Sequence, residues 1–307
     1  MHSASQLPNF LIIGAVKAGT SSIYRYLKTH PEIYMSPVKE PRYFVFPGIR
    51  PHLIGPDGKP LNDFMRFVWR LEDYRRLFAG RTVEKAAGEA SPQYLYSETA
   101  PGAIRELIPD ARLIAILRDP ADRAFSNFCH TRRDGNEPLP DFAAALEAED
   151  ARIAAGCWFN QYRNRGYYSR QLKRYLEIFP REQMLILLYD DLVSDCDRLL
   201  AQICAFLGVD DTFKFDTSVR FNVTVGMPRS VAFRKFLHSS GPAKRLLRAL
   251  LPDSLRLALY RRFSALNMGP KPVFEPSVRK ELVSAFRQDI LELEKLIDRD
   301  LSAWLRC

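Results

Sequence analysis

The segment from Phe10 to Ser22, FLIIGAVKAGTSS, constrains the fold of this chain more than any other. Its first four residues are an apolar run of the kind that a buried parallel strand needs. Gly14 then opens a turn, and Gly19 leads into a stretch with helical character. A strand, a glycine-bearing turn and a helix N-terminus direct unpaired backbone N–H groups and the positive end of the helix dipole at one place. The segment therefore predicts a phosphate-binding loop.

The spacing of the two glycines, with four residues between them, is that of a P-loop, but the lysine is displaced. Thr20 stands where the nucleotide triphosphatases carry lysine, and Lys17 lies inside the loop instead. We therefore expect a phosphate-bearing ligand other than a Mg·ATP complex. A nucleotide kinase or triphosphatase on the same scaffold is the alternative.

Strands and helices are expected to alternate along most of the chain. We predict strands over residues 10–13, 33–35, 83–88, 112–118 and 184–189. We predict helices over residues 22–29, 64–78, 101–108, 120–133, 141–157, 166–179, 192–207 and 277–304. Asp119 and Pro120 are a strong start signal for one of these helices, and Gly208 is a stop signal for another. This order predicts an α/β fold with a doubly wound, mainly parallel sheet flanked by helices.

Four motifs, in this order along the chain, resemble those of one enzyme family: KAGTSS (17–22), KEPRYF (39–44), GEASPQY (88–94) and LRDPADRAFSNF (117–128). The first and last resemble the cofactor signatures of the sulfotransferases that use 3′-phosphoadenosine 5′-phosphosulfate (PAPS). The middle two are similar to stretches of the carbohydrate (heparan-type) branch and its bacterial relatives. The resemblance implies one P-loop-like sulfotransferase domain over residues 1–307, with a helical C-terminal part from about residue 230 to 307.

The resemblance also implies where the donor binds. The first motif would hold the 5′-phosphosulfate through Lys17, Ala18, Gly19, Thr20, Ser21 and Ser22, and the last would hold the 3′-phosphate through Arg118 and Ser126. An alternative for Arg118 is a surface pair with Asp119 or Asp122. In-line sulfuryl transfer, like phosphoryl transfer, depends on placement and on neutralising charge at the leaving oxygen. Lys17 would stabilise that oxygen. We expect no metal, because the Cys, His and acidic residues show no metal-ligand spacing.

Glu40, in the second motif, is implied as the general base that deprotonates the acceptor hydroxyl, and Lys39 would assist with the charge of the sulfonate. Glu89 is the reserve carboxylate, and His130 is expected to be structural. Arg42 stands where such enzymes often carry histidine, and Ala90 where they frequently carry lysine. Neither a second base nor the acceptor contacts of the heparan-type enzymes can therefore be transferred. The acceptor is expected to be a carbohydrate, a glycolipid or another small hydroxyl compound.

The net charge of +9 is concentrated in one segment. Residues 229–262 contain nine Lys and Arg against one acid, Asp253. This segment would attract an anionic membrane or a polyanion, or would dock the acceptor; a solvated helical surface is the plain alternative, and no nucleic acid is expected. A non-catalytic module that binds membrane or polyanion is therefore a second alternative function. Five cysteines without a C-x-x-C pair, no signal-like start and no long apolar run predict a cytoplasmic protein. Residues 229–262 would allow it to associate with a membrane surface.

Overall fold

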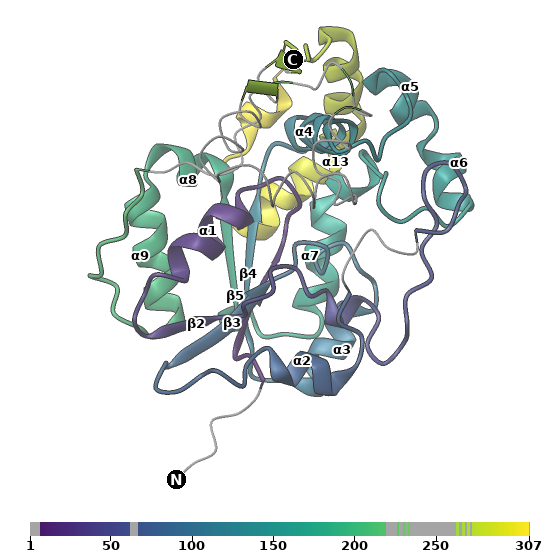
Figure 1. Cartoon of the computed structure of the whole chain (residues 1–307). Helices are drawn as coiled ribbons and strands as arrows, with labels where there is room; N and C mark the ends of the chain where they lie inside the picture. Colours follow the sequence, from purple (N-terminus) through teal and green to yellow (C-terminus); the bar gives the residue numbers. More distant parts are fainter. Residues whose placement is uncertain are drawn as a thin grey trace.

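The computed structural model describes residues 7–61, 67–218 and 272–306, together with residues 226, 230, 233, 262–263, 266–267 and 269–270 (Figure 1). Within them, one parallel sheet has the strand order β2-β3-β1-β4-β5. The strands are β1 (Phe10–Gly14), β2 (Ile33–Met35), β3 (Ala86–Ala90), β4 (Arg112–Leu117) and β5 (Met184–Leu188). All five residues of β1 are buried, as expected of a central strand that is covered on both faces.

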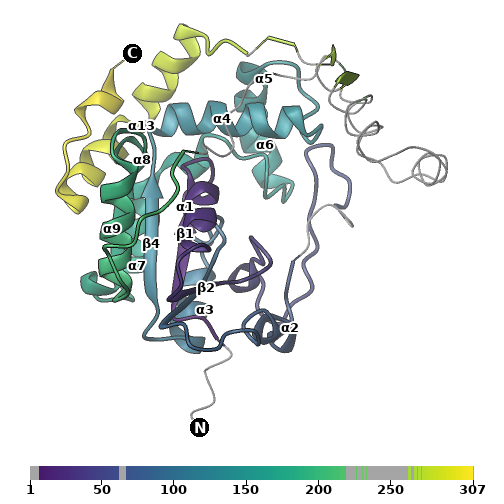
Figure 2. The same cartoon turned by 60° about the vertical axis from the view of Figure 1, so that its left-hand side comes forward.

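Helices cover both faces of this sheet, with α1 and α9 on one side and α7 on the other (Figures 1 and 2). The helices are α1 (Thr20–Leu27), α2 (Leu71–Arg76), α3 (Ala100–Leu107), α4 (Pro120–Arg133), α5 (Phe142–Glu147), α6 (Glu149–Ala154), α7 (Tyr168–Leu176), α8 (Tyr189–Ser194), α9 (Cys196–Leu207) and α13 (Pro276–Ile297). The C-terminal helix α13 packs against α7 and α4. The predicted parallel sheet flanked by helices is confirmed.

The start of α4 forms as its sequence predicts. Asp119 is the N-cap, and its Oδ1 accepts hydrogen bonds from the backbone N–H groups of Ala121 at 2.8 Å and Asp122 at 3.2 Å. Pro120 occupies the first helical position, where no N–H is needed. Gly208, at φ 72°, ends α9 in the left-handed conformation that glycine allows. Both boundaries depend on local chemistry.

Two boundaries were predicted wrongly because tertiary contacts use the local backbone. The helix expected from residue 64 begins at Leu71: the N–H of Val68 donates to the carbonyl of Pro41 at 2.9 Å, and the carbonyl of Trp69 accepts from Gly48 at 2.8 Å. The strand expected from residue 83 begins at Ala86, where the Asn9 side chain accepts from the N–H of Ala87 at 2.8 Å, and Val83 before it is 88% exposed.

Three predicted helices are divided or shortened. The helix over 141–157 breaks at Ala148 into α5 and α6, and the helix over 192–207 breaks at Asp195, whose side chain caps α9 by accepting from the N–H of Arg198. The helix over 277–304 ends at Ile297, since Asp298 adopts φ 52°, and a short 3₁₀ helix (Ser302–Leu305) follows.

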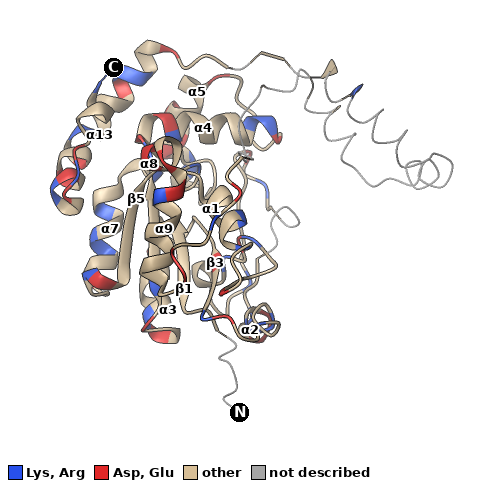
Figure 3. Cartoon of the chain, turned by 90° about the vertical axis from the view of Figure 1, so that its left-hand side faces the viewer, with Lys and Arg blue, Asp and Glu red and all other residues tan. Residues whose placement is uncertain are grey.

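The basic segment 229–262 lies outside the described residues except at 230, 233 and 262, so its interpretation stays a prediction. On the described helices, basic and acidic residues are interspersed, with a basic end on α4 (Figure 3). No helix in the described ranges has the length and apolar character to cross a membrane.

A stability prediction follows from the contact between β1 and β3. Phe10 lies opposite Gly88 in the strand register, and a Cβ on Gly88 would come within 2.4 Å of the Phe10 ring. Gly88→Ala should therefore lower the free energy of unfolding by about 1–3 kcal/mol, because a buried ring must move. Gly102→Ala is the matched control: it lies within α3 with no atom near its Cβ position and should raise stability by about 0.5–1 kcal/mol. Urea unfolding measures both, and equal stabilities would contradict the packing described.

Candidate active site

A cavity of about 1240 Å³ lies beyond the carboxyl ends of the strands. Because the strands are parallel, the segments that follow them meet at this edge. Among the lining residues, Lys17 and Gly19 follow β1, Lys39 and Glu40 follow β2, Pro92 and Gln93 follow β3, Arg118 follows β4, and Tyr189 follows β5. The residues predicted for the site that line the cavity are Lys17, Gly19, Thr20, Ser21, Ser22, Lys39, Glu40, Arg118 and Ser126. The sequence motifs, distant along the chain, converge at one place.

The loop between β1 and α1 presents a helix N-terminus to this cavity. Gly19 precedes α1 at φ 92° and is tightly enclosed, since a Cβ there would lie 2.5 Å from Leu192. No side chain caps the helix, and its first turn contains no acid. The first N–H groups of α1 and the helix dipole are therefore suited to an anion. Ala18, also predicted here, is fully buried in the core and does not line the cavity.

Lys17 lies in this loop with φ 69°. Burial and the neighbouring cations Arg133 and Arg118 together lower the pKa of its ammonium to about 8. No carboxylate of the described residues forms an ion pair with Lys17. The electrostatic situation is that of a buried cation suited to an anionic ligand.

Arg118 is held on the same side of the cavity. Its Nη1 donates to the carbonyl oxygen of Lys17 at 3.3 Å, and its guanidinium lies 4.8 Å from the ring centroid of Tyr189. The alternative for Arg118 was a surface pair with Asp119 or Asp122. Both acids instead pair with Arg279 of α13, at 2.8 Å for Asp119 and 2.5 Å for Asp122. The Arg118 guanidinium thus keeps donors for a ligand, and Ser126 lines the cavity from α4.

Glu40 lies among positive and polar neighbours. Its carboxylate pairs with Lys39, accepts from Arg42 Nη2 at 2.5 Å and accepts from Gln93 Nε2 at 3.0 Å. Burial alone would raise the pKa of Glu40, but the charges of Lys39 and Arg42 and these hydrogen bonds outweigh it and lower the pKa to about 2. Glu40 and Arg42 both have positive φ, near 60°. The backbone N–H of Glu40 is bound to the carbonyl of Ala90 at 3.1 Å. The carboxylate is therefore ionised at every physiological pH.

Glu89, the reserve carboxylate, is inside β3 rather than past its end and does not line the cavity. Burial raises its pKa to about 7, against the hydrogen bonds that it accepts from Tyr94 at 2.5 Å and Ser91 at 2.8 Å. Ser91 Oγ in turn accepts from the N–H of Arg42 at 3.0 Å. Glu89 therefore supports the segment that carries Glu40, from within the core.

Several lining residues were not predicted for the site. Arg42, Gln93, Phe159, Asn160, Arg165 and Tyr189 line the cavity, and so does His130, which was expected to be structural. Burial and the nearby charge of Lys17 lower the pKa of His130 to about 4, so its ring is neutral, and its Nδ1 accepts from Arg133 Nη2 at 2.6 Å. For Gln93 and His130 a signal existed, since Gln93 is within GEASPQY and His130 is one turn past Ser126.

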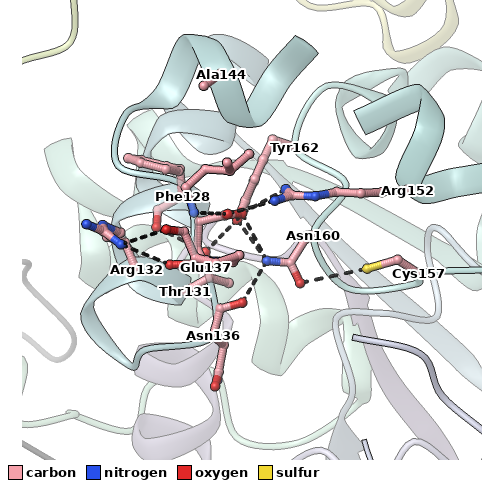
Figure 4. Close-up of polar contacts among 12 residues, drawn as sticks. Phe128, Thr131, Arg132, Asn136, Glu137, Ala144, Arg152, Cys157, Asn160 and Tyr162 are labelled. Carbon is pink, nitrogen blue, oxygen red and sulfur yellow. Dashed lines mark hydrogen bonds and ion pairs between the residues drawn. The ribbon is translucent and has the colours of Figure 1, made fainter. Parts of the chain in front are cut away.

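A buried polar cluster supports the part of the cavity wall that Thr131 and Asn160 form (Figure 4). The Glu137 carboxylate binds Arg152 through two hydrogen bonds of 2.8 Å and accepts from Tyr162 at 2.7 Å and from Asn160 at 3.1 Å. The hydroxyl groups of Tyr162 and Thr131 lie 2.7 Å apart. Because Asn160 and Thr131 both line the cavity, the cluster holds that wall in place. In the part of the chain that is described, no three His, Cys, Asp or Glu side chains gather in a group that could hold a metal.

Comparison with known proteins finds similar sulfotransferases. The sulfotransferase from Alicyclobacillus acidocaldarius is 34% identical, with 97% of this chain and 99% of that chain covered and a TM-score of 0.75. Mouse bifunctional heparan sulfate N-deacetylase/N-sulfotransferase 4 is 29% identical over 99% of this chain and 32% of its own length. Human heparan sulfate glucosamine 3-O-sulfotransferase 3B1 is 28% identical over 73% of this chain and 52% of its own length.

This chain thus spans about a third to a half of the length of these curated relatives. The resemblance to the heparan-type branch and its bacterial relatives is confirmed. The family match itself extends over residues 8–213, which includes the four motifs and every strand described above. The chain belongs to the sulfotransferase family.

Proposed function

We propose that this enzyme transfers a sulfuryl group from PAPS to a hydroxyl of a carbohydrate, a glycolipid or another small acceptor. The observation that carries the proposal is the convergence of Lys17, the uncapped start of α1, Arg118 and the ionised Glu40 on one cavity. These groups match the two ends of a bisphosphorylated donor and the proton of an acceptor. The heparan sulfate sulfotransferases among the relatives support a carbohydrate acceptor.

The residues proposed to bind the donor follow β1 and β4. The N–H groups at the start of α1, with the hydroxyls of Thr20, Ser21 and Ser22, would bind the 5′-phosphosulfate. Ala18 would contribute through its backbone only, since its side chain is in the core. Arg118 would bind the 3′-phosphate with two parallel N–H donors, and Ser126 would add its hydroxyl. A ligand with phosphate at both ends satisfies both groups, whereas ATP satisfies one.

The acceptor side begins at Glu40. PAPS supplies an activated sulfuryl group: a bond forms from sulfur to the acceptor oxygen as the bond from sulfur to the 5′-phosphate oxygen breaks. Glu40 takes the acceptor proton, Lys17 neutralises charge on the leaving oxygen, and Lys39 faces the sulfonate. The products are a sulfate ester and adenosine 3′,5′-bisphosphate. The proposal gives no step to a metal ion.

The role of Arg118 is tested by nucleotide binding. Calorimetric titration of the wild type should show that adenosine 3′,5′-bisphosphate binds about tenfold to hundredfold more tightly than adenosine 5′-monophosphate, because charge-assisted hydrogen bonds contribute about 1.5–3 kcal/mol. Arg118→Ala should remove most of this preference and leave the monophosphate affinity unchanged. The control is Arg105→Ala, at the exposed end of α3.

Two results would contradict the proposal. One is an Arg118→Ala variant that keeps the full preference for the bisphosphate, which would place the 3′-phosphate elsewhere. The other is tighter binding of Mg·ATP than of the bisphosphate by the wild type, which would favour the kinase or triphosphatase alternative.

A further inference from the structure

The first turn of the C-terminal helix α13 is bound to α4, the helix that carries Ser126. Arg279 of α13 donates through Nη2 to Asp119 at 2.8 Å and through Nη1 to Asp122 at 2.5 Å. Asp119 is the N-cap of α4, and Asp122 lies in its first turn. One guanidinium therefore spans both acids at the start of α4, with a charge-assisted hydrogen bond to each.

An aromatic stack holds the same part of the chain on α4. The Phe274 ring, just before α13, stacks on the Phe125 ring, with centroids 4.6 Å apart and ring planes at 11°. The guanidinium carbon of Arg279 lies 5.7 Å from the centroid of the Phe274 ring. Phe125 immediately precedes Ser126, one of the two residues proposed to bind the 3′-phosphate. The Arg279 guanidinium is thus held by the ring as well as by the acids, and its side chain is 24% exposed.

The two acids lie next to the other residue proposed for the 3′-phosphate. Asp119 follows Arg118 directly, and its side chain is 11% exposed. Burial and the charge of Asp122 raise the pKa of Asp119, whereas Arg279 opposes that rise. Among the described residues, Arg279 is the cation that forms ion pairs with these acids. Two unpaired carboxylates would therefore adjoin the phosphate site if Arg279 were replaced.

The local charge balance shows what Arg279 contributes. In the group formed by Arg118, Asp119 and Asp122, the acids outnumber the cation, and Arg279 makes the group neutral. A phosphate monoester carries a charge of about −1.5 to −2 at neutral pH, so uncompensated acids beside it would repel it. A released carboxylate would also compete with the phosphate for the guanidinium of Arg118. Both effects act on the 3′-phosphate and spare the rest of the nucleotide.

We propose that Arg279 is a positioning residue for the donor: by holding the two acids of α4, it keeps Arg118 available for the 3′-phosphate. Arg279 does not line the cavity, so it acts through the acids rather than by contact with the ligand. The C-terminal helix thereby becomes part of the donor site, although none of the four sequence motifs includes it. This inference rests on the proposed function, because it needs the 3′-phosphate at Arg118 and Ser126.

The test compares the affinities for adenosine 3′,5′-bisphosphate and adenosine 5′-monophosphate, which differ only in the 3′-phosphate. Each is titrated calorimetrically at an ionic strength of about 0.01 M, where charges act over about 30 Å. Arg279→Met should lower the preference for the bisphosphate at least about fivefold relative to the wild type and leave the monophosphate affinity unchanged. Arg299→Met is the matched control: it removes an ion pair of the same C-terminal region, with Asp191 of α8, and should keep the preference.

A second substitution shows whether Arg279 acts through the acids. Arg279→Met combined with Asp122→Asn removes one of the two released charges, so the preference should recover at least about threefold over Arg279→Met alone. Asp122→Asn by itself, with Arg279 in place, should raise the wild-type preference about twofold or more, because one negative charge near the phosphate is lost. The Asp122 side chain is 40% exposed, so this variant provides a test even if Arg279→Met fails to fold.

A folded Arg279→Met variant that keeps the wild-type preference would overturn the proposal. So would one that loses the same factor of affinity for both nucleotides, since that is the result of a general structural role. An unchanged or lower preference in Asp122→Asn would also overturn it. Equal affinity of the wild type for the two nucleotides would instead contradict the proposed function. The two ideas therefore fail by different measurements.

Discussion

Lys17→Ala is expected to lower kcat by about two to three orders of magnitude, the loss typical when one preorganised charge at a developing oxyanion is removed. The ammonium is buried, lines the cavity and forms no ion pair with a carboxylate of the described residues. Its removal takes away transition-state stabilisation and relieves the cost of a buried charge. The free energy of unfolding should therefore be unchanged or higher. Lys28→Ala, at the exposed end of α1, is the control.

The same lysine predicts a pH dependence. Burial, together with Arg133 and Arg118, lowers the pKa of Lys17 to about 8 in the free enzyme. The ammonium is present below that pH and is lost above it, so kcat/KM for the donor should fall as pH rises through about 8. Lys17→Arg should be slower but should lack this alkaline limb, because a guanidinium does not titrate in this range.

Rates measured from about pH 6 to about pH 9.5 test both statements, since kcat/KM reports the ionisation of the free enzyme. A Lys17→Ala variant within tenfold of the wild type would contradict the role of Lys17 at the leaving oxygen. An alkaline limb that persists in Lys17→Arg would assign the limb to another group.

The parts of the fold that were predictable have local causes. The buried strands β1 and β4 are uninterrupted apolar runs, and α4 begins at an Asp–Pro pair that caps it. The start of β3 was not predictable in this way, because it depends on Asn9, which is distant along the chain: the Asn9 side chain donates to the carbonyl of Lys85 and accepts from the N–H of Ala87. Secondary-structure propensity therefore predicts boundaries that depend on neighbouring residues, but not those that depend on contacts between distant segments.

The site shows the same division. The motifs place Lys17, Arg118 and Glu40 at strand ends, and parallel strands then bring them together. The surroundings of each group were not predictable. From the sequence, Arg42 was noted only because it replaces a histidine of the resembling enzymes. In the structure, residues 40 and 42 have left-handed backbone conformations, and the Arg42 guanidinium pairs with the Glu40 carboxylate. Arg165 lies in the polar segment RNRG (163–166), where nothing in the sequence distinguishes it from Arg163. Only the packing of its guanidinium against Tyr96 and Trp158 shows that it is buried.

Glu40→Gln is expected to lower kcat by about two to four orders of magnitude, because the amide has the shape of the carboxylate but cannot accept the acceptor proton. Lys39 and Arg42 lower the pKa of Glu40 to about 2, against the effect of burial. The carboxylate is thus ionised throughout the working range. The ratio of wild-type to variant rates should therefore be constant from about pH 5 to about pH 8. Glu106→Gln, on the exposed face of α3, is the control.

Stability gives a second readout of the same residue. A carboxylate with a pKa lowered in the folded state stabilises the protein above its unfolded pKa, and that stabilisation is lost as pH falls toward the folded value. The unfolding free energies of wild type and Glu40→Gln should therefore differ at neutral pH and converge between about pH 4.5 and about pH 2.

Binding of adenosine 3′,5′-bisphosphate should be unaffected, since Glu40 follows β2 at the far side of β1 from Arg118. Wild-type turnover by Glu40→Gln across this pH range would mean that the acceptor proton leaves by another route, and His130, the neutral imidazole on the same cavity, would be the next group to replace.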